Sequence, residues 1–569
     1  MPPKRQLVKL KVSPEFLKTL PVFATPKAKR VKKIAEDKKN EKNDKTSSPG
    51  PHDDNSKVNS GMKELSTAGL TVHSVNANFA LDKSGRPAKK WVRGSRQFKT
   101  FSGFKVKLKT WRHKSEREKH DPPKEETPQD SLPKQEEPAS STQANHAISN
   151  KQLLYTTDRL TPGSIFFLPH GTRIFNKLVG FMKNQQTKYG FQEVISPLIY
   201  KNELWKQSGH WDNYKEDMFK VVGNDLSKEE GDACEHEDQH EYGLKPMNCP
   251  GHCIIFSKFD KSYSELPVRY SDFSSLHRNE ASGALSGLTR VRRFHQDDGH
   301  IFCALHQINE EITNTINLIK DTYSVFGIDS TKDVEFYLST RPEKFMGEIG
   351  AWDEAESQLR EVLDATAGKD GWNIREGDGA FYGPKIDILL TDAFGKKHQV
   401  GTIQLDFQLP SRFELQYTAQ SGSKVQPIMI HRAVFGSLER FFAILLDHYQ
   451  GAWPFWLNPR QAVIVPVSEK HVEAAKTLQK QISGDIAYSD SVAPITGFNF
   501  YVDIDSRDES VGNRIRDAVQ KKYSYILMLG DRDIEQGTVA VRTRENRKVK
   551  NMTPKEIGDL FVSLERSFQ

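Results

Sequence analysis

The composition of this 569-residue chain changes sharply near residue 150, and that change confines a large packed core to the part that follows. Residues 29–150 are dominated by Lys, Glu, Asp, Ser, Pro and Gln, with few aromatic residues outside one island at 81–118. Such a stretch cannot bury enough apolar surface to offset the entropy lost on ordering. We therefore expect residues 1–150 to be basic and largely disordered, and the globular fold to begin at residue 151.

The island at 81–118, hereafter the basic island, combines cations with aromatic side chains. Residues 89–117 hold eleven Lys or Arg against one acid, Glu116, and include Trp91 and Trp111. A basic surface interleaved with aromatic residues is typical of contacts with nucleic acid or an acidic partner. A short pair of strands with a solvated, charged face explains the same pattern, and both alternatives stay open.

Apolar periodicity returns at residue 151 and continues to the C-terminus. A helical period covers 173–189, and strand-like runs separated by Gly, Asn and Asp follow it, which indicates a mixed α+β body up to residue 458. The acid-rich stretch 223–242 interrupts this body, and its charges predict an exposed insertion.

A second boundary follows Asn458-Pro459, because strand and helix patterns alternate beyond it. The predicted strands cover 461–467 and 525–529, and the predicted helices cover 471–482 and 511–522. This order predicts a small α/β domain with a largely parallel sheet at 459–569.

Composition also excludes several classes of protein. The sequence has no run of about 18 apolar residues, so we expect no membrane partner, and the basic start lacks the apolar stretch of a secretory signal. The four cysteines form no CxxC pair, which favours a reducing compartment over a disulfide scaffold. A net charge of +7 supports a nucleic-acid partner only weakly.

Two arginine-bearing segments, 276–280 and 288–300, are joined by a Gly/Ser-rich loop. If both are strands, Arg278 and Arg290 share one surface, where guanidinium groups suit phosphate oxygens, and Phe294 is placed to stack on a base. A hairpin with solvated arginines is the alternative interpretation.

A further segment, 429–442, leads into a predicted helix with a core-facing apolar stripe. Arg440 lies off that stripe near a Gly-Ser pair, so it could reach a phosphate from a rigid element. An ordinary surface arginine explains the position equally well.

These segments, with Pro197 after the long helix, resemble the three signature motifs of class II aminoacyl-tRNA synthetases. Five more segments resemble the threonyl-tRNA synthetases in particular: Lys245–His252, Gln296–Phe302, Arg341–Lys344, Gly379–Lys385 and Thr402–Phe407. The resemblance implies an α+β catalytic domain at 151–458, an antiparallel sheet with helices, followed by an α/β anticodon-binding domain at 459–569.

The resemblance also implies a zinc ion bound by Cys249, His300 and His431. One sulfur and two nitrogen ligands leave the fourth position of a tetrahedral ion open for a substrate. Spacing alone could not group these residues, since they lie 51 and 131 positions apart. His252 and Cys253 do not match the family's ligand positions, and we interpret them as structural.

The family's substrate contacts map onto single positions of this sequence. The resemblance implies that Gln296, Asp298 and Tyr382 form the threonine pocket, and that Lys385 and Gln404 contact the substrate and its adenylate. It implies an ATP site, with magnesium, formed by Arg278 at the α-phosphate, Arg290 and Arg440 at the outer phosphates, and Glu280 and Phe294 at adenine.

The implied reaction joins threonine to tRNA(Thr) in two steps. Threonine first reacts with ATP to form threonyl-adenylate, and the threonyl group is then transferred to the tRNA. Positioning and charge stabilisation suffice for the first step, so no nucleophilic residue is required. In the anticodon-binding domain, Asp533 and Arg542 match positions that recognise bases. The family further implies a homodimer.

Residues 1–150 have neither the length nor the composition of the ubiquitin-like and editing domains of full-length bacterial and cytosolic members. The chain therefore resembles the truncated synthetases of fungal mitochondria, and we expect it in the mitochondrial matrix. Residues 1–23 are basic with Glu15 the single acid, as in a mitochondrial presequence.

The segment 96–112, with its charged continuation, resembles a small subunit of a fungal ATP-dependent chromatin-remodelling complex. This gives the alternative function: a nuclear protein that contacts DNA or a chromatin complex through 81–118. In that case the chain is a natural fusion, or two neighbouring genes joined in one predicted reading frame.

Overall fold

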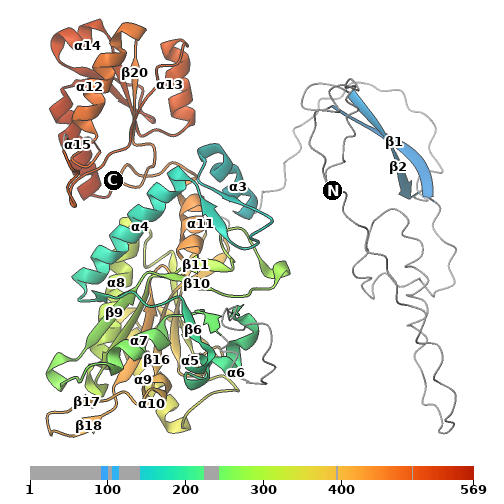
Figure 1. Cartoon of the computed structure of the whole chain (residues 1–569), viewed down its shortest axis with the longest axis vertical. Helices are drawn as coiled ribbons and strands as arrows, with labels where there is room; N and C mark the ends of the chain where they lie inside the picture. Colours follow the sequence, from blue (N-terminus) through green and yellow to red (C-terminus); the bar gives the residue numbers. More distant parts are fainter. Residues whose placement is uncertain are drawn as a thin grey trace, which may run out of the picture. The chain divides into compact units, whose positions relative to one another are not determined.

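The structure is a computed structural model that describes residues 91–99, 105–113, 141–222, 242–392, 395–487, 489 and 491–569. The chain divides into two compact units, residues 1–132 and 133–569. In the first, β1 (Trp91–Lys99) pairs antiparallel with β2 (Lys105–His113), drawn in blue in Figure 1. The described residues of the basic island, 91–99 and 105–113, therefore form a strand pair.

The second unit is built on an eight-stranded sheet in the order β14-β13-β15-β16-β19-β12-β9-β5. Neighbouring strands are antiparallel except in the edge pairs β13-β14 and β5-β9. This confirms the antiparallel sheet expected of a class II catalytic domain. The strands are β5 (Gln192–Glu193), β9 (Val268–Asp272), β12 (Asp298–Cys303), β13 (Val334–Ser339), β14 (Trp372–Arg375), β15 (Lys385–Thr391), β16 (Lys397–Asp406) and β19 (Ile428–Ala433).

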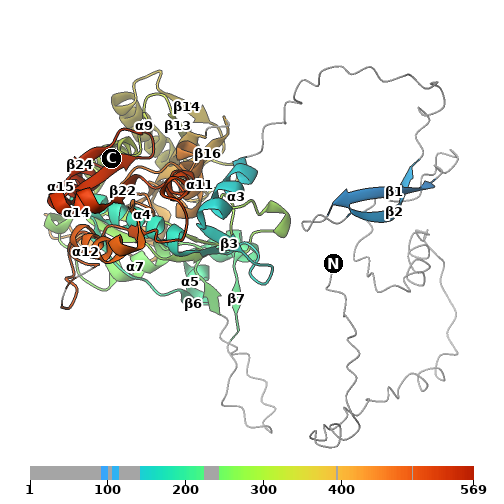
Figure 2. The ribbon, with the colours of Figure 1, turned by 90° about the horizontal axis from the view of Figure 1, so that it is seen from above.

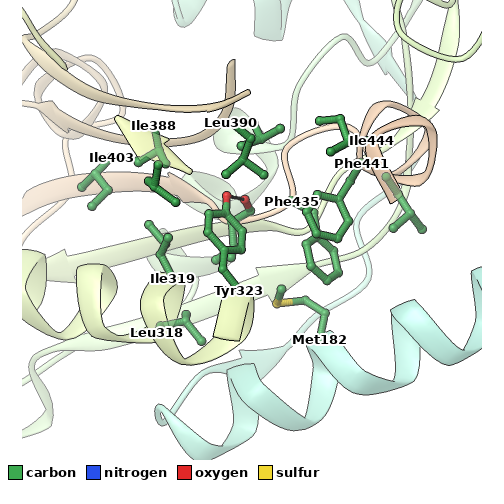
Figure 3. Packing of buried hydrophobic residues seen from close by; sticks show 14 of the residues in the cluster. Met182, Leu318, Ile319, Tyr323, Ile388, Leu390, Ile403, Phe435, Phe441 and Ile444 are labelled. Atoms are coloured by element: carbon green, nitrogen blue, oxygen red, sulfur yellow. Dashed lines mark hydrogen bonds between the residues drawn. The ribbon is translucent and has the colours of Figure 1, made fainter. Parts of the chain in front are cut away.

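Four long helices pack on one face of this sheet and bury the main apolar core. They are α4 (Pro169–Lys188), α8 (Ile308–Val325), α9 (Ile349–Thr366) and α11 (Leu438–Tyr449). Figure 3 shows Tyr323 of α8 among Leu390 of β15, Met182 of α4 and Phe435. The Tyr323 hydroxyl donates to the Val434 carbonyl at 2.6 Å, so the one polar atom of this ring is satisfied inside the core.

Shorter elements complete the catalytic part of the second unit. They are β3 (Tyr155–Thr157), β4 (Ile165–Phe167), β6 (Ile199–Lys201), α5 (Asn202–Gln207), α6 (His210–Tyr214), β7 (Lys220–Val221), β8 (Tyr242–Leu244), α7 (Cys249–Ser257), β10 (Ser275–His277), β11 (Arg293–His295), α10 (Gln408–Arg412), β17 (Tyr417–Thr418) and β18 (Lys424–Val425). The predicted insertion at 223–242 lies outside the described residues except for its last residue. None of the helices in the described ranges is long and apolar enough to cross a membrane.

The C-terminal part forms a five-stranded sheet, β21-β20-β22-β23-β24, drawn in orange and red in Figure 1. Its first three strands are parallel and the last two antiparallel, so the sheet is mixed. Helices α12 and α15 pack on one core, and α13 contributes to a second. The elements are β20 (Ala462–Pro466), α12 (Val472–Ile482), β21 (Val502–Ile504), α13 (Val511–Gln520), β22 (Tyr525–Leu529), α14 (Asp531–Gln536), β23 (Val539–Thr543), β24 (Lys550–Met552) and α15 (Pro554–Arg566).

Helix α3 (Ser141–Gln152) precedes the expected start of the catalytic domain and lies beside α11 (Figure 1, Figure 2). Its contacts with the core include hydrogen bonds as well as the apolar side chain of Ile148: Asn145 Nδ2 donates to the Ala443 carbonyl at 3.3 Å. The buried Gln152 amide donates to the Gly451 carbonyl at 2.7 Å and accepts from Trp453 Nε1 at 2.9 Å. The packed part of the chain thus begins before residue 151.

Replacing Gln152 with Ala is expected to lower the free energy of unfolding of the catalytic domain by about 3 kcal/mol, because two buried polar groups lose their partner. Urea unfolding followed by tryptophan fluorescence measures the shift. The exposed neighbour substitution Lys151→Ala is the control and should leave the midpoint unchanged. Equal midpoints for the two variants would show that the hydrogen bonds of Gln152 contribute nothing to the stability of the domain.

Candidate active site

Alternation along the central strands divides their side chains between the core and a cavity. In β12, Ile301 and Cys303 belong to the helix-covered core, whereas His300 faces a cavity of about 620 Å³. Residues directly opposite each other on antiparallel strands share a face. His300 is opposite His431 of β19, which is opposite Gln404 of β16, so the three side chains form a row in the cavity wall.

The cavity brings together the residues that were predicted to contact threonine, ATP and the metal, with one exception. Twelve of them line it: Cys249, Arg278, Glu280, Arg290, Phe294, Gln296, Asp298, His300, Tyr382, Gln404, His431 and Arg440. Lys385 of β15 does not line the cavity. It is directly opposite Gln404 of β16, and its Nζ lies 2.9 Å from Asp387 Oδ2. Tyr382 donates its hydroxyl proton to Gln404 Oε1 at 2.5 Å, which joins two predicted substrate contacts.

The candidate metal ligands are brought together by three separate elements. Cys249 begins helix α7, and the donor atoms of Cys249, His300 and His431 all lie within 4.8 Å of one another. Burial raises the pKa of the Cys249 thiol well above its usual value, and the nearby Asp298 carboxylate raises it further. A thiol in such surroundings ionises when a cation binds it. The donor set, one sulfur and two imidazoles, fits zinc.

A carboxylate orients the second imidazole. Asp406, fully buried, accepts from His431 Nε2 at 2.8 Å, which leaves Nδ1 of that ring for a metal. The same carboxylate is fixed by the backbone N–H groups of Gln408 and Leu409, at 2.7 and 3.0 Å. This is the arrangement that holds a metal-binding histidine in one tautomer.

The other part of the cavity is cationic. Arg278 lies over the Phe294 ring, with 5.1 Å from Cζ to the ring centroid, and Arg290 Nε lies 3.0 Å from Glu280 Oε2. Burial lowers the pKa of the Arg440 guanidinium, and the charges of Arg278 and Arg290 lower it further. Three guanidinium groups near a single carboxylate leave an excess positive charge, which suits a polyphosphate.

The chain around Arg440 fixes this side chain at the cavity. Ser437 caps α11 by accepting the Arg440 N–H at 3.3 Å, and Arg440 itself donates to the Thr289 and Gln399 carbonyls. Gly436 precedes the cap with φ +65°, and an added Cβ would lie 2.2 Å from the Val400 carbonyl oxygen. Only glycine fits there, so the sharp turn onto the helix depends on this residue.

The two predicted anticodon contacts lie in the C-terminal domain. Asp533, in α14, accepts the Gly530 N–H at 2.9 Å through Oδ2. Arg542 lies on β23, directly opposite Ile526 of β22.

Several lining residues were missed by the sequence analysis. Thr402 lies two positions before Gln404 on β16, so strand alternation was a usable signal for it. Tyr214 and Met247 also line the cavity. His210 is fully buried, with Nε2 4.0 Å from Cys249 Sγ, and burial lowers its pKa to about 4. No sequence signal marked this lone histidine.

Comparison with known families agrees with this architecture. Residues 233–449 match the model of the tRNA synthetase class II core domain (G, H, P, S and T), and residues 461–564 match that of the anticodon binding domain. Residues 71–153 match the model of INO80 complex subunit Ies4. That last match extends through α3, whose side chains are hydrogen-bonded to the catalytic domain.

Individual relatives point the same way. The mitochondrial threonine–tRNA ligase of Saccharomyces cerevisiae is 51% identical over 436 residues, covering 74% of this chain and 91% of the relative. The probable mitochondrial threonine–tRNA ligase of Schizosaccharomyces pombe is 47% identical over 445 residues, covering 76% of this chain and 91% of the relative. A solved structure of the RNA binding domain of threonyl-tRNA synthetase from Cryptosporidium parvum is 41% identical, with a TM-score of 0.66 over 74% of this chain and 98% of that one. On its sequence, its fold and its cavity, the chain belongs to the threonine–tRNA ligases, a family of class II aminoacyl-tRNA synthetases.

Proposed function

We propose that this chain activates L-threonine with ATP and transfers it to the 3′ end of tRNA(Thr) for mitochondrial translation. One observation supports this most directly: a single cavity has a cysteine and two histidines in one part, and Arg278, Arg290 and Arg440 in another. The first group suits a zinc ion and the second a triphosphate with magnesium. Relatives named mitochondrial support the compartment, and we place the enzyme in the matrix.

Threonine binds, in this proposal, beside Cys249, His300 and His431, which would hold zinc. When bound, the ion would supply a Lewis-acid contact to the amino and hydroxyl groups of the substrate. The buried Asp298 carboxylate, fixed by Asn248 Nδ2 at 3.0 Å, accepts a hydrogen bond from the amino group of the substrate. A site that engages the hydroxyl penalises its absence, which is how valine is rejected.

The chemistry of activation needs alignment and charge neutralisation. A carboxylate oxygen of threonine attacks the α-phosphorus of ATP, the bond from that phosphorus to the bridging oxygen breaks, and pyrophosphate leaves. Arg278 binds the carboxylate and the α-phosphate, while Arg290 and Arg440 hold the outer phosphates with magnesium. Phe294 packs on adenine, and Glu280 contacts its edge.

In the second step a terminal ribose hydroxyl of tRNA(Thr) attacks the activated carbonyl, and AMP leaves. The tRNA is selected in part by the C-terminal domain, through Asp533 and Arg542. Gln404, which accepts from Tyr382, contacts the substrate and its adenylate. Lys385 does not line the cavity, so its contact with the adenylate requires its ammonium group to leave Asp387.

Charging of transcribed tRNA(Thr) tests this proposal. Full-length protein with ATP, magnesium and labelled threonine is expected to charge tRNA(Thr) and to leave tRNA(Val) and tRNA(Ser) uncharged. An Arg542→Ala variant should charge more weakly while activating threonine normally, because it acts on the tRNA alone. Well-folded protein that charged none of these tRNAs would refute the proposal.

We further infer a homodimer, formed through the apolar segment that follows β5. Ile195, Leu198 and Ile199 are 87, 44 and 47% exposed in the single chain. A cluster of this kind is typical of a surface covered by a partner, and a second copy of the chain is the partner that the family implies.

Replacing Ile195 with Glu is expected to convert the dimer to monomer at micromolar concentration, because it buries a charge in the interface. Analytical ultracentrifugation measures the change. The same substitution at Ile495, a fully exposed isoleucine of the C-terminal domain, serves as control and should leave the dimer intact. A parent protein that sediments as a monomer would contradict the inference.

A second candidate function rests on the match of residues 71–153 to a chromatin-remodelling subunit. In this proposal the basic island contacts DNA or the complex in the nucleus, and the synthetase follows in the same chain. A fragment of residues 133–569 distinguishes the two functions: it should charge tRNA(Thr) as the full chain does, while any nuclear association is lost. Nuclear association that survived the deletion would contradict this second function.

A further inference from the structure

Helix α7 carries a fully buried histidine, His252, that was expected to be structural only. Its Nδ1 lies 2.7 Å from Nδ1 of His300, and the two rings meet edge to face with centroids 4.6 Å apart. We propose that His252 is a positioning residue, which holds His300 so that its other nitrogen, Nε2, faces the metal site. The proposal rests on the zinc site proposed above.

The hydrogen bond determines which nitrogen of His300 is free. Two Nδ1 atoms 2.7 Å apart share one proton, so one ring donates and the other accepts. An imidazole binds a metal through its unprotonated nitrogen, so a metal on Nε2 requires the proton of His300 on Nδ1. His300 then donates and His252 accepts, which leaves the proton of His252 on Nε2.

The far side of His252 faces an acceptor. Its Nε2 lies 3.9 Å from Asp272 Oδ2 and has no hydrogen-bond partner among the described residues. A carboxylate at that position favours the tautomer with a proton on Nε2, which is the one the first hydrogen bond needs. Asp272, His252 and His300 thus form a line that ends at the metal site.

The carboxylate at the start of this line is held firmly. Asp272 accepts from the Ser196 N–H at 3.1 Å and hydroxyl at 2.5 Å, and from the Ser274 hydroxyl at 2.6 Å. Lys245 Nζ, itself fully buried, lies 3.6 Å from Oδ2 and supplies a compensating charge. A fixed acceptor restricts His252, and His252 in turn restricts His300.

Helix α7 links these roles to a ligand. Cys249 and His252 are three residues apart, so they lie on neighbouring parts of the same helix face. One turn of helix therefore supplies one candidate ligand and orients another. Residues that orient a metal ligand typically change metal affinity by about 10–100-fold when replaced.

Two polar substitutions separate positioning from packing. In His252→Asn, Oδ1 takes the place of the ring Nδ1 and can still accept from His300. In His252→Gln, the amide oxygen lies one bond farther out, so the acceptor is misplaced. Cys253→Ala, on the same helix with its Sγ 3.8 Å from Met429 Sδ, is the control for a change in packing.

The test measures the zinc dissociation constant of full-length protein by competition with a chelating dye, and the absorption spectrum of the cobalt-substituted form. We expect His252→Gln to bind zinc about 10–100-fold more weakly with an altered cobalt spectrum. His252→Asn and Cys253→Ala should stay close to the parent protein. If His252→Gln fails to fold, His252→Phe, which keeps the ring but has no acceptor, gives the same comparison.

Zinc affinity in the Gln variant equal to that of the parent protein would overturn the positioning role, since this variant misplaces the acceptor. A parent protein that binds no zinc would refute the zinc site itself, and the inference with it. The two failures are therefore distinguishable in one experiment.

Discussion

Replacing Cys249 with Ser is expected to abolish zinc binding and to lower kcat/KM for threonine activation on the order of 10³-fold, or about 4 kcal/mol of transition-state stabilisation. The thiol is one of three donors that lie within 4.8 Å of one another, and a serine hydroxyl is a poor replacement for a thiolate. Metal analysis and steady-state kinetics on the same preparation measure the two effects.

The control for this substitution is Cys303→Ser. Cys303 lies on β12 three positions beyond His300, but it faces the helix-covered core rather than the cavity. This variant should keep its zinc and its activity even if it is less stable. Parallel loss of zinc and activity in both variants would indicate general disruption of the sheet and would contradict a specific role for Cys249.

Replacing Arg278 with Ala is expected to lower kcat for adenylate formation on the order of 10²–10³-fold, because a preorganised charge at the reacting phosphate is lost. Its guanidinium lines the cavity over Phe294 and close enough to Arg440 to lower the pKa of that group. Arg278→Lys should recover part of the rate, since it restores charge without the planar fork. Rapid-quench measurement of adenylate formation reports this step directly.

Arg293→Ala is the matched control. Arg293 belongs to β11, next to Phe294, but its side chain is exposed and does not line the cavity. We expect less than about a twofold change in this variant, as is usual for surface positions. A normal rate of adenylate formation in Arg278→Ala would show that this residue takes no part in the reaction, whatever the result for Arg293→Ala.

Much of the fold was predictable because its local signals are strong. The helix expected at 173–189 is α4, Pro169–Lys188, which begins four residues earlier with proline in its first turn. The strand expected at 525–529 is β22 with the same bounds. Helix α3 was missed because its buried residues, Asn145, Ser149 and Gln152, are polar and form no apolar stripe.

The candidate site was predictable only through resemblance to a family. His300, His431 and Gln404 form one row because β12, β19 and β16 are neighbours in the sheet, and strand order is a long-range property that periodicity does not reveal. The role of His252 was unpredictable for the same reason: its contact with His300 joins a helix to a strand 48 residues away. Sequence motifs predicted the candidate residues, and the order of the strands explains why His300, His431 and Gln404 lie together.

The central claim is that one cavity selects threonine and activates it with ATP, and threonine-dependent exchange of pyrophosphate into ATP tests it most directly. The account predicts rapid exchange with threonine, exchange with serine about 10–200-fold slower for the missing methyl group, and exchange with valine on the order of 10⁴-fold slower for the missing hydroxyl. Exchange that is absent from folded, zinc-loaded protein, or equal for threonine and valine, would contradict it.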